Sequence, residues 1–288
     1  MTSRRPNPAL WLMALMLVGA LFVVAYIGFV RTATGQQLDD SLMVAAQRFL
    51  SVEVARNGAI GFLRYLPELS AVLAALALLV AAIVRRSITA PVIAVVAALA
   101  AASSTQILKA LLPRPNLGIS EATMNSFPSG HTTVAAAAMI AVVLVSSPRW
   151  RPAAATLGGL FASTAAASTY VLGWHRPADV IGAVLVAAGW GLIAGVVILW
   201  REPDWNTWQR GTEGAPSGVW LGLPWIPALV GLGSAVGIWY GLLREPTRPF
   251  EDLLGWYVLA GLGLVLGATM GVFGAASGLL SQQTRSVD

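Results

Sequence analysis

The stretch ADVIGAVLVAAGWGLIAGVVILW at residues 178–200 has one charged residue, Asp179, and is otherwise apolar or small. A helix needs roughly 20 residues to cross the hydrocarbon core of a membrane, which is about 30 Å thick. Similar stretches occur along the rest of the chain, at residues 9–30, 62–84, 89–111, 131–147, 153–174, 217–242 and 253–279. The sequence therefore predicts an all-α, polytopic bundle of about eight transmembrane helices.

The composition of the whole chain agrees with this prediction. Of 288 residues, 57% are hydrophobic and 11% are charged, and these values lie outside the range of a soluble globular domain. The absence of cysteine excludes disulfides, thiolate metal ligands and a cysteine nucleophile. The net charge of +5 comes from scattered basic residues, so we expect membrane lipids and no nucleic acid as partners.

Basic residues predict the orientation of the bundle. Two short loops without acidic residues, and the segment before the first apolar stretch, contain Arg85, Arg86, Arg149, Arg151, Arg4 and Arg5. The positive-inside rule places these residues on the cytoplasmic face. The first stretch is longer than the hydrophobic region of a signal peptide, so we expect it to be retained. The chain is then a multi-pass protein of the cell membrane.

The chain divides into three parts. Residues 1–200 are predicted to form a six-helix core. Residues 201–216 are polar and are predicted to be a cytoplasmic linker, and residues 217–288 a C-terminal pair of transmembrane helices. Glycines at four-residue spacing on the last helix predict close packing against a neighbouring helix or a second subunit: Gly263, Gly267 and Gly271.

Residues 31–61 form the longer connection between the first two apolar stretches. Its apolar residues recur at helical spacing, at Leu38, Leu42, Ala45 and Phe49, and its polar residues include Asp39, Asp40, Gln47 and Arg48. This pattern predicts an amphipathic helix at the membrane interface. The sequence leaves open whether the helix covers a lipid entrance or only lies on the membrane surface.

The chain has two histidines, and the first, His131, begins an apolar helix after Ser129 and Gly130. The first N–H groups of a helix lack internal acceptors and point the positive end of the helix dipole toward an anion. Glycine lets the backbone approach that anion closely. The segment therefore predicts an anion site, although a plain Ser-Gly helix start has the same residues.

The second histidine, His175, stands four residues before Asp179, with Pro177 suited to a first helical turn. If this turn is helical, the carboxylate can hold one imidazole nitrogen and leave the other free to attack. An activated histidine nucleophile requires this arrangement. A surface His-Asp pair is the alternative.

Two cations, Lys109 and Arg114, lie at the outer end of another helix and in the loop that follows it. A guanidinium fork and an ammonium suit the oxygens of a phosphoryl group and can offset the charge of its transition state. By itself, Lys109 could simply reach toward the membrane interface.

In this order, the three groups of residues resemble the motifs of the type 2 phosphatidic acid phosphatase (PAP2) superfamily: Lys109 with Arg114-Pro115, then Pro128-Ser129-Gly130-His131, then Ser168, His175 and Asp179. The resemblance covers roughly residues 70–200, with all motifs within 109–179. It implies a PAP2-like helical core, chemistry without a metal or other cofactor, and a phosphohistidine intermediate that water hydrolyses.

The resemblance also implies a role for each residue. His175 corresponds to the nucleophile, Asp179 to its orienting carboxylate, and His131 to the acid that protonates the leaving alkoxide. Four residues correspond to the phosphate-binding set: Lys109, Arg114, Ser129 and Gly130.

Two departures from the family pattern concern phosphate-binding arginines. Asn116 stands where the first motif normally has its arginine, and Arg114 is expected to reach the phosphate from two residues earlier. Thr169 stands where the third motif normally has arginine after Ser168. Arg176, beside the nucleophile, is a candidate substitute that binds substrate.

The expected function is hydrolysis of a lipid phosphate or diphosphate, prenyl or glycerolipid, on the extracytoplasmic side of the membrane. Two alternatives remain open. One is a phosphotransferase, in which a lipid or sugar alcohol takes the phosphoryl group from the phosphohistidine. The other is a non-catalytic lipid-binding or transport protein, which is suggested by Thr169 in the place of the expected arginine. The sequence leaves the lipid substrate and the oligomeric state open.

Overall fold

A computed structural model describes residues 7–49, 53–120, 124–209, 218–245 and 247–287. The helices of these residues are α1 (Pro8–Ala25), α2 (Ala33–Phe49), α3 (Glu53–Arg85), α4 (Thr89–Leu111), α5 (Gly130–Val145), α6 (Arg151–Val171), α7 (Pro177–Arg201), α8 (Gly218–Gly222), α9 (Trp225–Leu242) and α10 (Leu254–Gln282). A π-helical turn, Tyr26–Val30, continues α1, and 3-10 turns lie at Pro203–Asn206 and Phe250–Leu253. Every predicted apolar stretch therefore contains a helix, and the stretch 217–242 is divided between α8 and α9.

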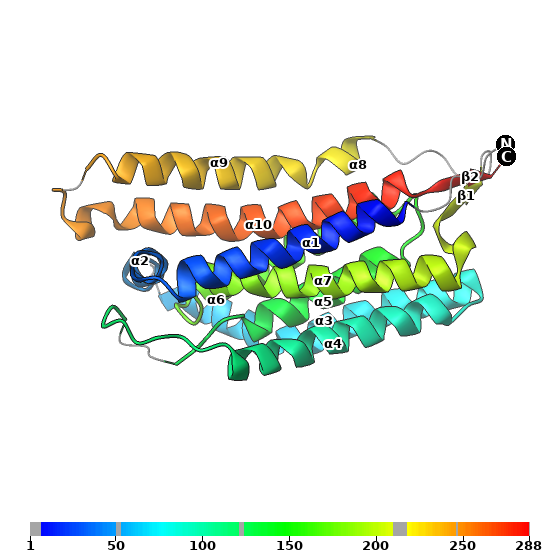
Figure 1. Cartoon of the computed structure of the whole chain (residues 1–288), viewed down its shortest axis with the longest axis horizontal. Coiled ribbons are helices and arrows are strands. Elements are labelled where there is room, and N and C mark those ends of the chain that lie inside the picture. The colour runs from blue at the N-terminus through cyan, green and yellow to red at the C-terminus, as the bar shows by residue number, and fades with distance from the viewer. Residues whose placement is uncertain (1–6, 50–52, 121–123, 210–217, 246, 288) are drawn as a thin grey trace.

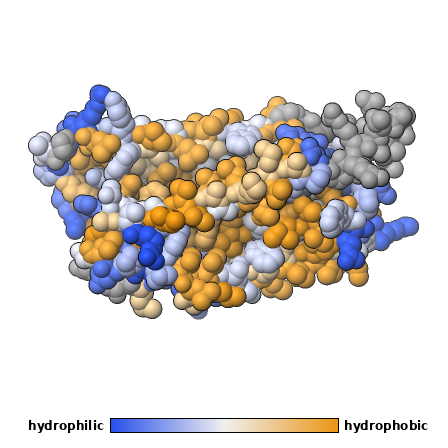
Figure 2. All heavy atoms as spheres, viewed as in Figure 1, coloured by the Kyte–Doolittle hydropathy of each residue, from blue (hydrophilic) through white to orange (hydrophobic). Residues whose placement is uncertain are grey.

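The long helices run side by side along one axis, and α2 crosses them near one end of the bundle (Figure 1). A broad apolar band covers the middle of the molecule, while hydrophilic residues gather at both ends (Figure 2). Among the described residues, 6 helices are long and apolar enough to cross a membrane: α1 with its π-helical turn, α3 from residue 57, α4, α7, α9 with the end of α8, and α10 with the turn before it. The chain is thus an all-α, multi-pass membrane protein.

The predicted count of about eight spans exceeds these six because α5 and α6 differ from the others. α5 has 16 residues, and α6 is rich in alanine, glycine, serine and threonine. Both helices are largely buried by their neighbours, α5 among α3, α4, α6 and α7, and α6 against α5 and α10. A helix enclosed by protein does not need the length or apolarity of one that faces lipid.

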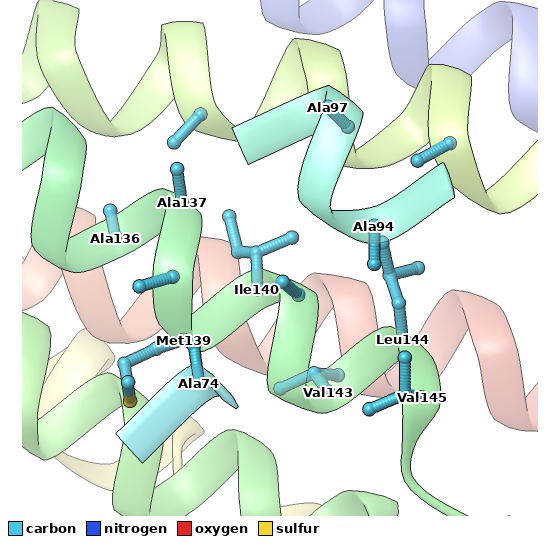
Figure 3. Close-up of a cluster of buried hydrophobic side chains, with 14 of the residues drawn as sticks. Ala74, Ala94, Ala97, Ala136, Ala137, Met139, Ile140, Val143, Leu144 and Val145 are labelled. Carbon is cyan, nitrogen blue, oxygen red and sulfur yellow. The ribbon is translucent and has the colours of Figure 1, made fainter. Parts of the chain in front are cut away.

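Small side chains let the helices around α5 approach closely. The α5 side chains Ile140 and Leu144 pack with Ala94 and Ala97 of α4 in the main hydrophobic cluster (Figure 3). All four are buried. Close packing of this kind replaces the hydrophobic driving force that helices lack within a lipid environment.

The glycines of the last helix pack within the chain. A Cβ at Gly263 would lie 2.5 Å from the backbone oxygen of Gly231 in α9, and one at Gly267 would lie 2.8 Å from the backbone nitrogen of Leu232. Gly271 packs more loosely, because a Cβ added there would lie 3.9 Å from the Cβ of Ala228. Of the two partners that the sequence left open, the neighbouring helix is the one observed.

Residues 31–61 contain the predicted helix, α2, and its buried face agrees with the prediction in part. Leu42 and Ala45 are buried, as the amphipathic pattern predicts, but two other residues differ. Asp39 is 1% exposed, whereas Phe49 is 52% exposed. The helix is buried against the π-helical turn Tyr26–Val30 and against α6, α7 and α10 rather than only resting on a membrane surface, so protein contacts determine which of its faces is covered. The second half of the predicted connection belongs to α3, which begins at Glu53.

The opposite end of the bundle corrects the interpretation of Arg151. Its guanidinium is buried and donates to the side-chain oxygen of Asn206 at 2.6 Å and to the Ser146 carbonyl at 3.0 Å. Arg151 therefore ties the α5–α6 loop to the start of the predicted linker, where a solvent-exposed topology signal was expected. Arg4 and Arg5, and residues 210–217 of the predicted linker region, lie outside the described residues.

The same end also holds the two strands of the described residues. β1 (Thr207–Gln209) pairs in parallel with β2 (Arg285–Val287) and joins the end of α7 to the C-terminal segment. Both strands lie at the end of the bundle where α1 begins and α10 ends, far from α2 (Figure 1).

Candidate active site

The start of α5 has the geometry that its sequence predicts. Ser129 is the N-cap, and its hydroxyl oxygen accepts a hydrogen bond from the Thr132 N–H at 3.4 Å. The Ser129 N–H donates to the backbone oxygen of Asp179 at 2.9 Å. This bond joins the second motif to the third, so the first turns of α5 and α7 lie together.

The end of α4 brings Lys109 to this place. A Cβ added to Gly130 would lie 3.9 Å from Lys109 Nζ and 3.5 Å from Gln106 Nε2, so both side chains pass over the start of α5. A hydrogen bond of 3.0 Å between the Thr105 and Thr133 hydroxyls fixes α4 against α5. Gln106 was not among the predicted residues, although it precedes Lys109 by three positions and such residues share a helix face.

His175 and Asp179 interact, but not as two residues of one helix. Arg176 is the N-cap of α7, with extended backbone, and His175 precedes it. Asp179 Oδ2 lies 3.3 Å from His175 Nδ1 and also accepts hydrogen bonds from the Arg176 N–H at 3.0 Å and the Ser126 hydroxyl at 2.7 Å. The carboxylate thus caps the helix and orients the imidazole at the same time.

The burial of this pair and the contact within it show which imidazole nitrogen of His175 is available for a further partner. The Asp179 side chain is fully buried, whereas 11% of the His175 side chain is exposed. Because Nδ1 faces Asp179, the other ring nitrogen, Nε2, is available for a further partner.

His131 lies close to the pair of His175 and Asp179. Its ring is tilted against that of Trp174, with the centroids 5.7 Å apart, and it is close enough to interact electrostatically with both His175 and Lys109. The three separate motifs of the sequence therefore meet at one end of the bundle.

Arg114 is a half-buried cation whose terminal nitrogens lack hydrogen-bond partners among the described residues. Both of these nitrogens, Nη1 and Nη2, are themselves buried. Burial, followed by repulsion from Arg176, lowers the pKa of the Arg114 guanidinium, while Asp179, Asp39 and Asp40 act in the opposite direction. A guanidinium stays charged in proteins, and leaving its buried N–H donors without acceptors costs free energy. The arrangement suits an anion that supplies the missing acceptors.

Arg176 is held differently from the expectation that it binds substrate. Its guanidinium donates to Asp40 Oδ1 at 2.8 and 3.2 Å, to Ser120 at 2.6 Å and to Ser126 at 3.3 Å. Thr169, where the family pattern has arginine, is buried and donates to the Ala166 carbonyl. The substrate-binding role of Arg176 stays a prediction, since its donors already have partners.

No group of three or more side chains from His, Asp and Glu that could hold a metal ion occurs in the part of the chain that the structure describes.

The fold is that of a helical, multi-pass membrane protein, and two histidines, a buried carboxylate and two cations meet at one end of its bundle. Residues 90–205 match the model of the PAP2 superfamily, and this part of the chain is a PAP2 superfamily domain. The matched region contains all three motifs and runs from α4 to the 3-10 turn after α7. No curated protein and no solved structure matches the chain.

The unpartnered guanidinium generates a prediction. In Arg114→Gln, inorganic phosphate or vanadate should bind about tenfold more weakly or worse, because a hydrogen bond to a charged group contributes about 1.5–3 kcal/mol. Without the anion, the variant should be at least as stable as the wild type, since a buried unpaired charge is removed. Thermal denaturation in detergent at increasing anion concentration measures both effects.

The matched control is Arg248→Gln, which removes an exposed guanidinium and should leave the anion-dependent rise in melting temperature unchanged. If Arg114→Gln also keeps the full rise, Arg114 does not bind the anion.

Proposed function

We propose that the chain is a phosphatase that hydrolyses a lipid phosphate or diphosphate through a phosphohistidine intermediate. The PAP2 domain indicates phosphatase-type activity on phosphate esters, and the proposal specifies its substrate class and mechanism. The observation that carries it is the meeting of His131 with the His175–Asp179 pair beside the unpartnered Arg114. Paired histidines with one oriented by a carboxylate suit covalent phosphoryl transfer better than simple binding.

The first step forms the covalent intermediate. Nε2 of His175 attacks phosphorus, a P–N bond forms, and the bond between phosphorus and the lipid oxygen breaks. His131 donates a proton to the departing oxygen, and the lipid leaves as an alcohol, or as a monophosphate if the substrate is a diphosphate. Asp179 accepts a hydrogen bond from Nδ1 and stabilises the positive charge that develops on the imidazole of His175.

The second step regenerates the enzyme. His131, now neutral, accepts a proton from water as the water oxygen attacks phosphorus and the P–N bond breaks. Inorganic phosphate leaves and both histidines return to their starting states. Lys109, Arg114, the Ser129 hydroxyl and the Gly130 N–H stabilise the phosphoryl oxygens during both steps. This role fits the start of α5, where N–H groups without internal acceptors face the anion.

The lipid character of the substrate is supported by the depth of the site. The candidate residues lie at and after the end of α4, at the starts of α5 and α7 and between α6 and α7, all at one end of the bundle. Hydrophilic residues gather at both ends of the bundle, on either side of the apolar band (Figure 2). A phospholipid or prenyl phosphate places its headgroup at this depth and its chains within the band. No movement of the phosphate through the hydrocarbon core is then required.

The extracytoplasmic orientation is also part of the proposal. Arg85, Arg86 and Arg149 lie near the end of the bundle opposite the site, and the positive-inside rule favours a cytoplasmic position for them. In this cysteine-free chain, Leu117→Cys should be labelled by a membrane-impermeant maleimide in intact cells, and Arg149→Cys only after the cells are opened. The reverse pattern would place the site in the cytoplasm.

The main test separates the two histidines by leaving group. Purified protein should release phosphate from at least one member of a panel of prenyl diphosphates, phosphatidic acid and phosphatidylglycerol phosphate. His175→Ala should abolish turnover of every substrate, because no intermediate forms. His131→Ala should lower turnover of the lipid by about a hundred- to ten-thousand-fold, but much less with p-nitrophenyl phosphate, whose leaving group needs little protonation.

Two results would count against this assignment. Activity of His175→Ala on p-nitrophenyl phosphate together with complete loss in His131→Ala would reverse the two roles. Failure of the wild type to release phosphate from any member of the panel would remove lipid phosphate hydrolysis as the function.

A further inference from the structure

α2 supplies two carboxyl groups to the site from outside the PAP2 domain. The helix precedes the matched residues 90–205, yet it contacts two of the three motif regions. Gln36 Nε2 donates to the Pro115 carbonyl at 2.9 Å, and Gln47 Nε2 donates to the Gly173 carbonyl at 3.1 Å. α2 is therefore fastened to the loop that carries Arg114 and to the turn before His175.

Asp39 and Asp40, in the middle of this helix, contact different groups of the site. Asp40 forms an ion pair with the buried Arg176 at 2.8 Å. Asp39 is 1% exposed, and its Oδ1 accepts a hydrogen bond from the Ala178 N–H in the first turn of α7 at 3.0 Å. Its Oδ2 is buried and has no partner among the described residues.

The first turn of α7 thus holds two carboxyl groups. Asp179 accepts three hydrogen bonds through Oδ2, which suits an ionised carboxylate because that form is an acceptor only. Asp39 accepts one hydrogen bond, and each of the two carboxyl groups has a second buried oxygen without a partner among the described residues, Oδ2 of Asp39 and Oδ1 of Asp179. Two buried charges of the same sign that interact would repel each other, and the usual outcome is that one carboxyl group keeps its proton.

We propose that Asp39 is a positioning residue for the reaction: its carboxyl group ties the first turn of α7 to α2, fixes Asp179 behind His175, and through its own charge state controls how well an anionic substrate binds. This inference rests on the proposed function and adds a residue that lies outside the PAP2 domain. When Asp39 is neutral, Arg114 faces two carboxylates, Asp179 and Asp40. When Asp39 is ionised, Arg114 faces three.

The groups around Asp39 decide where it titrates. Asp179 and Arg176 of the α7 start, Arg114 of the loop after α4, Tyr170 of α6 and its own neighbour Asp40 all face it. Burial, and next the charge of Asp179, raise the pKa of Asp39 to about 8, against the opposing effects of the Ala178 N–H, Arg176 and Arg114. The neutral form therefore dominates at pH 7, and the ionised form becomes the major form above pH 8.

The first test is the pH dependence of KM. For a lipid monophosphate, the wild-type KM should rise on the order of tenfold between pH 7 and pH 9, because one negative charge is added near the substrate. Asp39→Asn keeps an oxygen that can accept from Ala178 but cannot ionise, so this rise should disappear. Comparison of the two proteins cancels the titration of the substrate and of the histidines.

The matched control is Asp252→Asn, the same substitution at an exposed carboxylate, which should keep the wild-type ratio of KM values. If Asp39→Asn also keeps that ratio, or if the wild-type ratio is flat, Asp39 does not control substrate binding.

The second test does not depend on activity. A carboxyl group whose pKa is raised in the folded state stabilises the fold fully below its unfolded pKa of about 3.9, and this contribution is lost as pH rises through the folded pKa. The wild-type melting temperature should therefore fall by about 5 °C or more from pH 5 to pH 8 relative to that of Asp39→Asn. Parallel curves for the two proteins would show that Asp39 is ionised throughout and would overturn the inference.

The two tests also separate the inference from the proposed function. A wild-type protein that releases no phosphate from any lipid, but shows the difference in melting curves, would refute the function and leave the charge state of Asp39 established. Release of phosphate from a lipid together with parallel melting curves would support the proposed function and refute the inference about Asp39.

Discussion

The hydrogen bonds of Asp179 are the constraint on which the site depends. A fully buried carboxylate is tolerated only where donors replace the water that it has lost. Here the donors come from Ser126, from the backbone of Arg176 and from His175, while the backbone oxygen of the same residue accepts from Ser129. One residue therefore joins the starts of α5 and α7 to the imidazole between them. The position of His175 follows from how this charge is satisfied.

The rest of the bundle holds that arrangement in place. The hydroxyl pair of Thr105 and Thr133 fixes α4 against α5, and the Tyr170 hydroxyl donates to the Leu42 carbonyl at 2.9 Å, which holds α6 against α2. α10 then packs on α6 and α2 and is itself covered by α9 through glycines. The C-terminal pair thus supports the site from behind, although it lies outside the PAP2 domain and contributes no candidate residue.

The sequence predicted the helices well and their surroundings less well. Long apolar stretches are recognised from the composition of the sequence alone, and each of them contains a helix. Whether a helix faces lipid or protein depends on its neighbours, which is why α5 and α6 fall short of the length or apolarity of a span. The same reason explains Asp39 and Arg151: both are charged and were expected at a surface, yet each is buried because a partner distant in sequence, Ala178 or Asn206, meets its polar atoms.

Within the site, predictions from local spacing agreed with the structure more often than predictions about distant partners. Ser129, Gly130 and His131 lie at the start of α5, and His175 faces Asp179, as their order in the chain suggests. The engagement of Arg176 by Asp40 has no local signal, since 136 residues separate them. Gln106 does have a local signal, its spacing from Lys109, but it is not part of the family pattern.

The central claim is that His175 carries the phosphoryl group during turnover. Protein mixed with a lipid phosphate labelled in its phosphate group, and quenched with base during turnover, should retain label that is stable to base, released by acid and located on His175. The His175→Asn variant should retain none. Label found on His131, on a serine or on an aspartate would contradict the account.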